Sequence, residues 1–279
     1  MKKLIFIVIA ISLFGTLVAQ NQWDFTFDVK GTLNQSYYTD NWDGEEESNI
    51  NWITQGNMRA NRQISDWFKS MNSLKLKFGQ IYDTKKDEDG NQKPGWEDPR
   101  KSDDEIDLLA LGLFTLDGWV DPYASLRVQT VFEGNKLKAL NPLRFSQGIG
   151  AAKTILDFDR MGLDARLGLS LRQLHQYRQT TMVDGGFEFI TEFMYIEPFE
   201  KAKFTSTVQL FQALYNSEDD DLPNDYWKTL DVEWTNEVSI QIYKYMSFNI
   251  YSQLLYDKEI DRTGRFKQTS GLGLTYKIF

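Results

Sequence analysis

Hydrophobic and polar residues alternate along most of the chain with the period of two that is typical of β-strands. The clearest run is 161–177, MGLDARLGLSLRQLHQY, in which every second residue up to Leu171 is apolar. Asp164, Arg166 and Arg172 occupy the opposite face of the same run. Because successive side chains of a strand point to opposite sides, this pattern predicts a sheet with one apolar and one charged face.

About twelve such runs are predicted to be strands, with ends uncertain by a few residues. Their ranges are 23–38, 50–62, 68–82, 106–116, 120–132, 145–156, 161–177, 183–196, 202–215, 228–240, 246–256 and 266–278.

The connections between these runs alternate between short turns and longer polar loops. The short ones include QISD, DFDR and YKY, and the long ones include DNWDGEEES and NSEDDDLPND. Aromatic residues gather near both ends of the runs, as with Trp67 and Tyr243 beside short turns and Tyr177 and Tyr215 beside long loops. Short turns on one side, long loops on the other and two aromatic girdles are typical of outer-membrane barrels.

The first residues predict a secretory leader. Lys2 and Lys3 precede an apolar run from Leu4 to Ala19, and the expected cleavage follows Ala19. A membrane-anchoring helix is the alternative, but the run is shorter than the roughly 20 residues that a spanning helix needs. The predicted organisation is therefore a signal peptide at 1–19 and a single β-barrel domain at 20–279.

Composition narrows the classes of function. Without the leader lysines the chain has 29 basic and 40 acidic residues, a net charge of −11, which disfavours a nucleic-acid partner. The sequence contains no cysteine, so it has neither disulfides nor thiolate metal ligands. After the leader there is no apolar stretch long enough for a spanning helix, so any membrane crossing must use strands.

These observations predict an all-β fold, an antiparallel outer-membrane β-barrel of about twelve strands with both termini in the periplasm. The final segment, GLGLTYKIF, resembles the closing strand that the barrel assembly machinery reads in such proteins. The alternative fold is a soluble periplasmic β-sandwich or lipocalin-like barrel, in which the apolar faces would contact a protein core.

Two segments carry a family resemblance. Asn41 to Trp52, NWDGEEESNINW, and Pro99 to Leu108, PRKSDDEIDL, are joined through WFKSMNSLKLKFGQ. In these segments the chain resembles a family of Gram-negative envelope proteins that is known only as a domain of unknown function. The resemblance covers mostly the first half of the mature chain. It implies an outer-membrane type of β protein and no activity.

The inward faces of four neighbouring strands are predicted to carry a ladder of charges of both signs. If Tyr177 and Val183 bracket a hairpin, Arg172 lies opposite Glu188 and Gly168 lies opposite Glu192. Such a ladder could select a polar solute, or it could fill a narrow barrel with ion pairs. Its predicted members are Arg166, Arg172, Asp184, Glu188, Glu192, Lys203, Asp231, Glu233 and Glu237.

Three functions remain open. The first is a non-enzymatic channel or transporter for a small polar solute, and the second is a closed structural or surface-interaction barrel. The third is an outer-membrane hydrolase that uses His175, although no nucleophile motif accompanies this histidine and a position in an aromatic girdle explains it. The acidic stretches Asp87 to Gln92 and Ser217 to Asp225 are interpreted as solvated loops, which could contact lipopolysaccharide through divalent ions. No cofactor or resident metal is implied.

Overall fold

The computed structural model describes residues 23–36, 49–86, 92–116, 118–133, 140–218, 225–259 and 262–277. The predicted leader at 1–19 lies outside these residues. Within the described ranges no helix is long and apolar enough to cross a membrane. One short 3-10 helix, η2 (Tyr226–Lys228), accompanies the strands. The strands are β1 (Asp24–Ser36), β2 (Asn49–Ser65), β3 (Phe68–Lys86), β4 (Gln92–Trp96), β5 (Arg100–Leu113), β6 (Asp121–Thr130), β7 (Leu143–Phe158), β8 (Met161–His175), β9 (Met182–Ile196), β10 (Ala202–Asn216), β11 (Asp231–Tyr243), β12 (Met246–Tyr256) and β13 (Arg265–Lys277).

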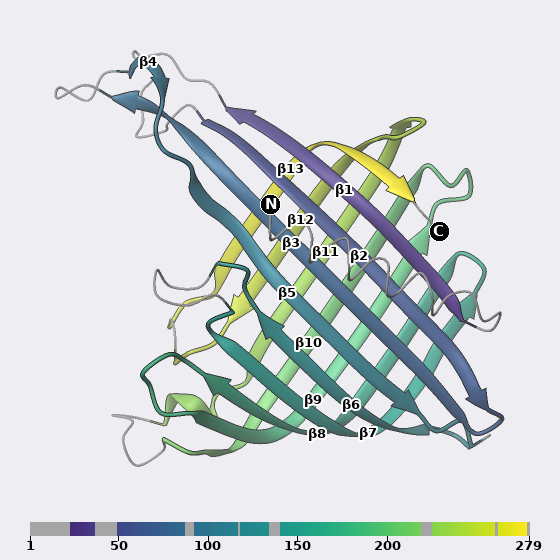
Figure 1. Cartoon of the computed structure of the whole chain (residues 1–279). Helices are drawn as coiled ribbons and strands as arrows, with labels where there is room; N and C mark the ends of the chain where they lie inside the picture. The colour runs from purple at the N-terminus through teal and green to yellow at the C-terminus, as the bar shows by residue number, and fades with distance from the viewer. Residues whose placement is uncertain are drawn as a thin grey trace.

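The strands form one closed antiparallel barrel. Consecutive strands pair from β5 to β13, β13 pairs with β1, and the β1–β2, β2–β3 and β3–β5 pairings complete the ring. β4 is an extra strand that pairs only with the end of β3. The barrel therefore has 12 strands and no free edge, as the sequence predicts. Figure 1 shows the strands crossing the barrel obliquely, with β4 projecting beyond its rim.

The connections have the predicted asymmetry. Two residues separate β7 from β8 and β11 from β12, whereas long connections follow β1, β3 and β10. β1 begins and β13 ends at the barrel end that carries the short connections (Figure 1). The loop between β8 and β9 is an exception, since only residues 176–181 separate the two strands on the long-loop side.

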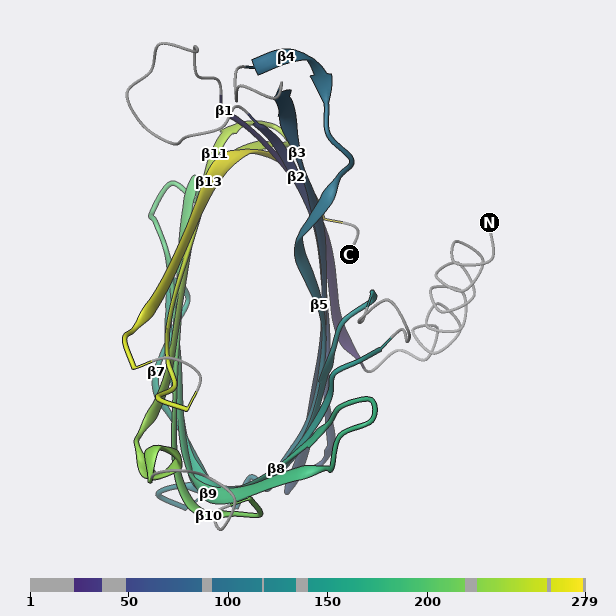
Figure 2. The same cartoon turned by 90° about the vertical axis from the view of Figure 1, so that its left-hand side faces the viewer.

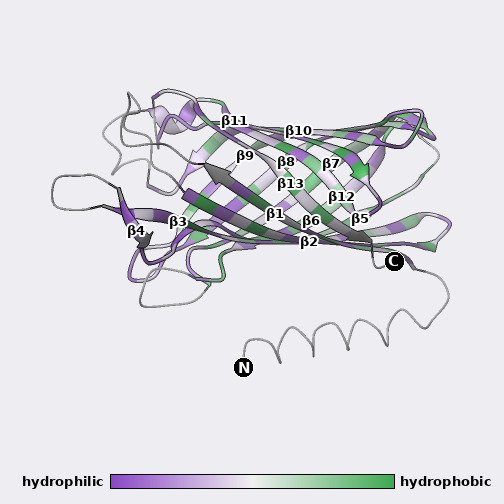
Figure 3. Ribbon diagram, turned by 90° about the horizontal axis from the view of Figure 1, so that it is seen from above, coloured by the Kyte–Doolittle hydropathy of each residue, from purple (hydrophilic) through white to green (hydrophobic). Residues whose placement is uncertain are grey.

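Apolar side chains cover the outside of the barrel, and polar ones face the lumen. On β8, Leu167, Leu169 and Leu171 are all exposed outward, while Arg166 and Arg172 point inward to ion-pair partners. Figure 3 shows hydrophobic and hydrophilic residues alternating along the strands. Exposed apolar surface on this scale marks contact with a partner or a membrane. The exposed apolar residues include Leu33, Leu108, Leu126, Ile149, Phe187, Leu214, Trp234, Phe266, Leu272 and Leu274.

Exposed aromatic residues lie at both ends of this apolar surface. Trp67, Trp119 and Tyr243 are exposed beside the short connections, and Tyr177 and Tyr215 are exposed at the end with the longer loops. Trp67 and Phe114 stack at 6.1 Å between ring centroids. Two aromatic zones that flank an apolar band match the interfacial girdles of a barrel in a bilayer. The described part of the chain is therefore a barrel of the outer-membrane type.

The barrel is flattened, and glycines allow its sharp curvature. Viewed along the axis, the ring is an oval with β8, β9 and β10 at one narrow end and β13 and β1 near the other (Figure 2). Gly150 of β7 lies opposite Gly168 of β8, and a Cβ on either would collide with the carbonyl oxygen of the facing strand. At the other end, a Cβ on Gly271 would collide with Asn34. Glycine kinks are a known means of bending a sheet tightly enough to close.

A charge placed on the outer face provides a test of membrane contact. Leu169, near the middle of β8, has 49% of its surface exposed. We expect Leu169→Arg to destabilise the barrel folded in lipid vesicles by about 2–4 kcal/mol, because the arginine would face hydrocarbon. A denaturant titration in vesicles would measure this loss.

Thr207→Arg is the matched control for this substitution. Thr207 is exposed to the lumen and lies opposite Glu192, so we expect an arginine there to cost less than about 1 kcal/mol. If both variants were equally stable, the outer face would not contact lipid and a soluble barrel would be favoured.

Candidate functional site

The nine residues of the predicted charge ladder all have lumen-facing positions on β8 to β11. The pairing registers align them on the same side as one another, opposite to the exposed leucines. Arg166 forms an ion pair with Glu192, and Arg172 forms one with Glu188 at 3.3 Å. Their role in selecting a solute remains a prediction.

The predicted hairpin register is wrong. Arg172 lies opposite Asp184 and not Glu188, and Gly168 lies opposite Glu188 and not Glu192. The reason is that β8 ends at His175 and the loop forms its own turn, in which Gln179 N–H donates to the Gln176 carbonyl at 3.1 Å. Arg172 reaches Glu188 diagonally, because a guanidinium side chain is long enough to span that offset.

A hydrogen-bonded chain crosses the lumen at one narrow end of the oval. Arg127 of β6 donates to Asp107 at 2.6 Å and to the Gln209 side chain on β10 at 3.0 Å. Gln209 in turn donates to Glu188 at 2.9 Å. Three strands separate β6 from β10 around the barrel wall, so this contact spans the interior.

Arg172 continues the chain of contacts toward the loop end. Besides Glu188, it lies 3.6 Å from Asp231 of β11, and its guanidinium sits 3.5 Å from the centroid of the Phe211 ring. Phe211 is only 2% exposed. Stacking on an aromatic face holds the guanidinium in place while both carboxylates remain in reach.

A second group of contacts crosses the lumen at the other narrow end. Asp103 of β5 accepts from Lys77 of β3 at 2.8 Å and from Lys267 of β13 at 2.7 Å. Lys77 also lies 4.5 Å from the ring centroid of Tyr251 on β12. Lys30 of β1 pairs with Glu237 of β11. The described lumen is therefore bridged at both ends of its oval section.

The charges are segregated across the flattened lumen. We call the lumen-facing side of β8 to β11 the acidic wall and that of β13, β1, β2 and β3 the basic wall. The acidic wall carries Asp164, Asp184, Glu188, Glu192, Asp231, Glu233 and Glu237 against Arg166, Arg172 and Lys203. The basic wall carries Arg265, Lys267, Lys30, Arg59, Lys69, Lys75 and Lys77 against Asp24, Asp28 and Asp83. The adjoining strand β5 adds the lumen-facing carboxylates of Asp103, Glu105 and Asp107. Lumen charges arranged in this way act on any charged or dipolar solute that passes between them.

The described part of the connection between β10 and β11 includes η2, which packs against β10 at the loop end. Trp227 of η2 is 6% exposed and forms a buried cluster with Phe211 and Ala213. Gln212 secures η2 by donating to the Lys228 carbonyl at 2.7 Å. The predicted strand start at Lys228 is wrong, because this residue belongs to η2 and β11 begins at Asp231.

His175 ends β8 and contacts a threonine hydroxyl and an aromatic ring. Its Nδ1 lies 2.9 Å from the Thr181 hydroxyl, and its ring packs edge-on against Phe145. Ser170 occupies the lumen-facing side of β8, the opposite face from His175. Among the described residues, no group of three or more histidines and carboxylates could hold a metal ion. Most of the two acidic stretches interpreted as solvated loops, Asp87 to Gln92 and Ser217 to Asp225, lies outside the described residues.

Several lumen residues were missed by sequence reasoning. Lys30, Lys77, Asp103, Asp107 and Arg127 occupy the polar side of alternating strands, so the same period-two pattern marks them as inward. The pattern does not show their partners across the lumen, which are Glu237 for Lys30, Lys267 for Asp103 and Gln209 for Arg127, because these partners lie far away in the sequence.

Comparisons with known proteins give only distant likenesses. No family model matches the chain and no curated protein matches it, so the resemblance to an envelope family is unconfirmed. The fold is similar to an outer-membrane channel from Pseudomonas putida F1, with 11% identity over 91% of this chain and 94% of that one and a TM-score of 0.44. It is also similar to the translocator domain of the autotransporter NalP from Neisseria meningitidis, with 8% identity, 92% and 88% coverage and a TM-score of 0.36. It is similar as well to OprB from Pseudomonas putida, with 10% identity over 94% of this chain and 96% of that one and a TM-score of 0.29.

Proposed function

We propose that the protein is a non-enzymatic barrel of the bacterial outer membrane whose lumen is a narrow channel for small polar solutes. The observation that carries this proposal is the charged interior. Ion pairs from opposite walls meet in the lumen, as between Lys30 and Glu237 and between Lys267 and Asp103. Some lumen charges stay partly exposed, such as Lys75 and Glu105 on the adjacent strands β3 and β5, with about a third of each side chain accessible. Partly hydrated charges of both signs are typical of the wall of an aqueous path.

The energetics of a closed barrel support the same reading. A barrel that needed only a filled interior would be at least as stable with well-packed apolar residues, because ion pairs lose much of their gain to desolvation. Lumen-facing Lys77, Asp103 and Arg127 instead bring charge into the interior. A permeation path for polar solutes gives these residues a use that packing alone does not.

The second candidate is a closed barrel that works through its loops. It is favoured by one observation, the burial of Trp227 against Phe211 and Ala213 at the loop end. In that case the ion pairs would serve as a hydrophilic plug, and the partners would be found at the surface, with lipopolysaccharide as the first candidate. In both cases we propose membrane lipid as the surroundings and the barrel assembly machinery as the route of insertion.

Conductance of the purified protein in a planar lipid bilayer tests the proposal. Reproducible discrete current steps are expected for a channel, with small amplitudes because contacts cross the lumen. Protein that inserts stably, shown by protection from protease, and yet carries no current would overturn the channel and leave the closed barrel.

The loop-side mouth provides a prediction about pH. Glu259, in the connection between β12 and β13, has its pKa raised to about 7 by partial burial and by the nearby carboxylates of Asp257, Asp184, Asp231 and Glu218. Above pH 7 the ionised Glu259 adds negative charge to this mouth, and below pH 7 it is neutral. We therefore expect the cation-to-anion permeability ratio to fall as the pH is lowered through about 7.

Reversal potentials under a salt gradient, recorded from about pH 8 to about pH 6, would measure this ratio. Glu259→Gln should reduce the change without abolishing it, because this side chain keeps its shape but no longer titrates, while the neighbouring carboxyl group of Asp231 remains at the same mouth. If the permeability ratio of Glu259→Gln channels changed with pH as much as that of the parent protein, the effect would come from another group.

A further inference from the structure

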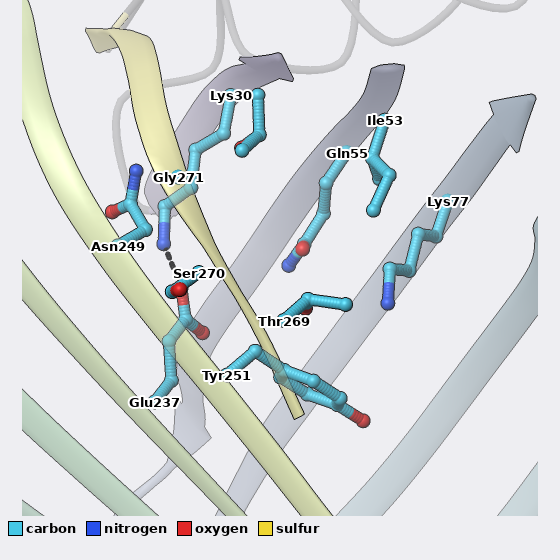
Figure 4. Close-up of a pocket in the computed structure, with 11 residues that line it drawn as sticks. Lys30, Ile53, Gln55, Lys77, Glu237, Asn249, Tyr251, Thr269, Ser270 and Gly271 are labelled. Carbon is cyan, nitrogen blue, oxygen red and sulfur yellow. Dashed lines mark hydrogen bonds and ion pairs between the residues drawn. The ribbon is translucent and has the colours of Figure 1, made fainter. Parts of the chain in front are cut away.

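A small cavity lies in the lumen between the basic wall and the strands that face it. Its volume is about 40 Å³, which is enough for a few water molecules. Figure 4 shows the side chains that line it: those of Lys30, Gln55 and Lys77 come from one side, and those of Glu237, Asn249 and Tyr251 come from the other. The cavity is therefore bounded by ammonium groups on one side and a carboxylate on the other.

Lys30 and Glu237 close this cavity by pairing with each other, as the dashed line in Figure 4 marks. Both side chains keep some solvent access, with 18% and 27% of their surfaces exposed. Lys77 is held differently, because it is bound to Asp103 at 2.8 Å and lies over Tyr251. The Lys30–Glu237 pair is thus the contact at the cavity that can open to admit a ligand, while Lys77 stays in place beside it.

The charges of a ligand decide whether it can replace this pair. A free cation bound at Glu237 would separate Lys30 from its ion-pair partner, and a free anion bound at Lys30 would leave Glu237 with only the less directly placed Lys75 and Lys203. Leaving a charge unpaired in a confined site is costly. A molecule that carries one carboxylate and one ammonium group satisfies both residues at once and leaves the net charge of the site unchanged.

We propose that this cavity binds small zwitterions of the amino-acid type, with the ligand carboxylate on Lys30 and the ligand ammonium group on Glu237. The Gln55 side-chain oxygen lies at the cavity as an acceptor, while the Gln55 amide nitrogen donates to Asn57 and the Asn249 amide is held by Ser239 and Ser247. The inference rests on the proposed channel function and names the class of solute that the channel would favour. The segregation of charge across the lumen supports it, because such a field aligns a dipolar solute with its ammonium end toward the acidic wall.

Four compounds of nearly equal size separate charge from shape. Glycine is zwitterionic, glycinamide is cationic, glycolate is anionic and glycolamide is neutral. Binding to the purified full chain in detergent is measured by calorimetry, and uptake of the labelled compounds is measured in vesicles that contain the protein. We expect glycine to bind and to enter vesicles about tenfold better than each of the other three. Equal values for glycine and glycolamide would overturn the proposal.

Variants assign the effect to the pair. We expect Lys30→Met and Glu237→Gln each to weaken glycine binding by about tenfold or more, because each removes one of two charged contacts. The double variant Lys30→Glu with Glu237→Lys restores both charges in reversed order and should recover most of the binding. Glu197→Gln, in the turn between β9 and β10, is the matched control outside the lumen and should bind glycine normally.

Binding by calorimetry and uptake into vesicles test the zwitterion site and the channel function separately. Uptake of all four compounds at one rate, without glycine binding, would overturn the zwitterion site and keep the channel. Glycine binding that depends on Lys30 and Glu237, without uptake of any compound, would keep the site and overturn the channel. Glycine binding that survives in Glu237→Gln would overturn the assignment of the site.

Discussion

Gly168→Ala is expected to prevent normal closure of the barrel, although it adds only one methyl group. The new Cβ of Gly168 would collide with the carbonyl oxygen of Ile149 on β7 and would lie 2.7 Å from the Tyr123 hydroxyl. Both obstacles are fixed, because one is strand backbone and Tyr123 is 5% exposed. Overpacking of this kind costs about 1–3 kcal/mol where neighbours can relax, and here the backbone of two paired strands must move.

The measurement is the yield of folded barrel after refolding into detergent, read from the mobility shift between heated and unheated samples on a gel. Gly162→Ala is the control on the same strand. A Cβ on Gly162 meets only the Leu156 carbonyl at 3.9 Å, so this variant should fold like the parent protein. Equal yields for the two variants would show that the curvature at β7 and β8 does not depend on the absence of a side chain at Gly168.

The strands could be predicted from the sequence because their pattern is local. The period-two alternation found every strand of the closed ring and the correct face of each ladder residue, since burial in lipid and exposure to a polar lumen impose opposite chemistry on alternate positions. The predicted ends were less accurate. β5 begins at Arg100, well before the predicted residue 106, because its polar first residues remain paired to β3 although they show no hydrophobic alternation.

The contacts across the lumen could not be predicted, because they depend on how the closed barrel is flattened. Nothing near Glu237 in the sequence points to Lys30, which is brought to it only when β13 joins β1 and the oval brings β1 and β11 close. The register of the β8–β9 hairpin was missed for a more local reason. It depends on whether Tyr177 belongs to the strand or to the turn, and the hydrophobic pattern at Tyr177 fits both. The short strand β4 was also missed, since it has no alternating pattern.

The ion pairs of the lumen differ in how much the fold depends on them, and Asp103 is the extreme case. It is 8% exposed and is the acceptor for Lys77, itself 7% exposed, and for the more accessible Lys267. We expect Asp103→Asn to lower the free energy of unfolding by about 3 kcal/mol, because it leaves the buried ammonium group of Lys77 without a counter-charge. Denaturant titration of the folded barrel, followed by tryptophan fluorescence, would measure the loss.

A double variant separates the unpaired charge from other effects of the substitution. Lys77→Met combined with Asp103→Asn removes the stranded ammonium group and should recover most of the stability, since a buried ion pair contributes little more than an apolar replacement of similar size. Asp164→Asn is the control, because Asp164 is exposed in the lumen and hydrogen-bonded to Thr154, and it should cost less than about 1 kcal/mol. If the double variant were as unstable as Asp103→Asn alone, the loss would come from the local packing of Asp103 and not from the unpaired charge of Lys77.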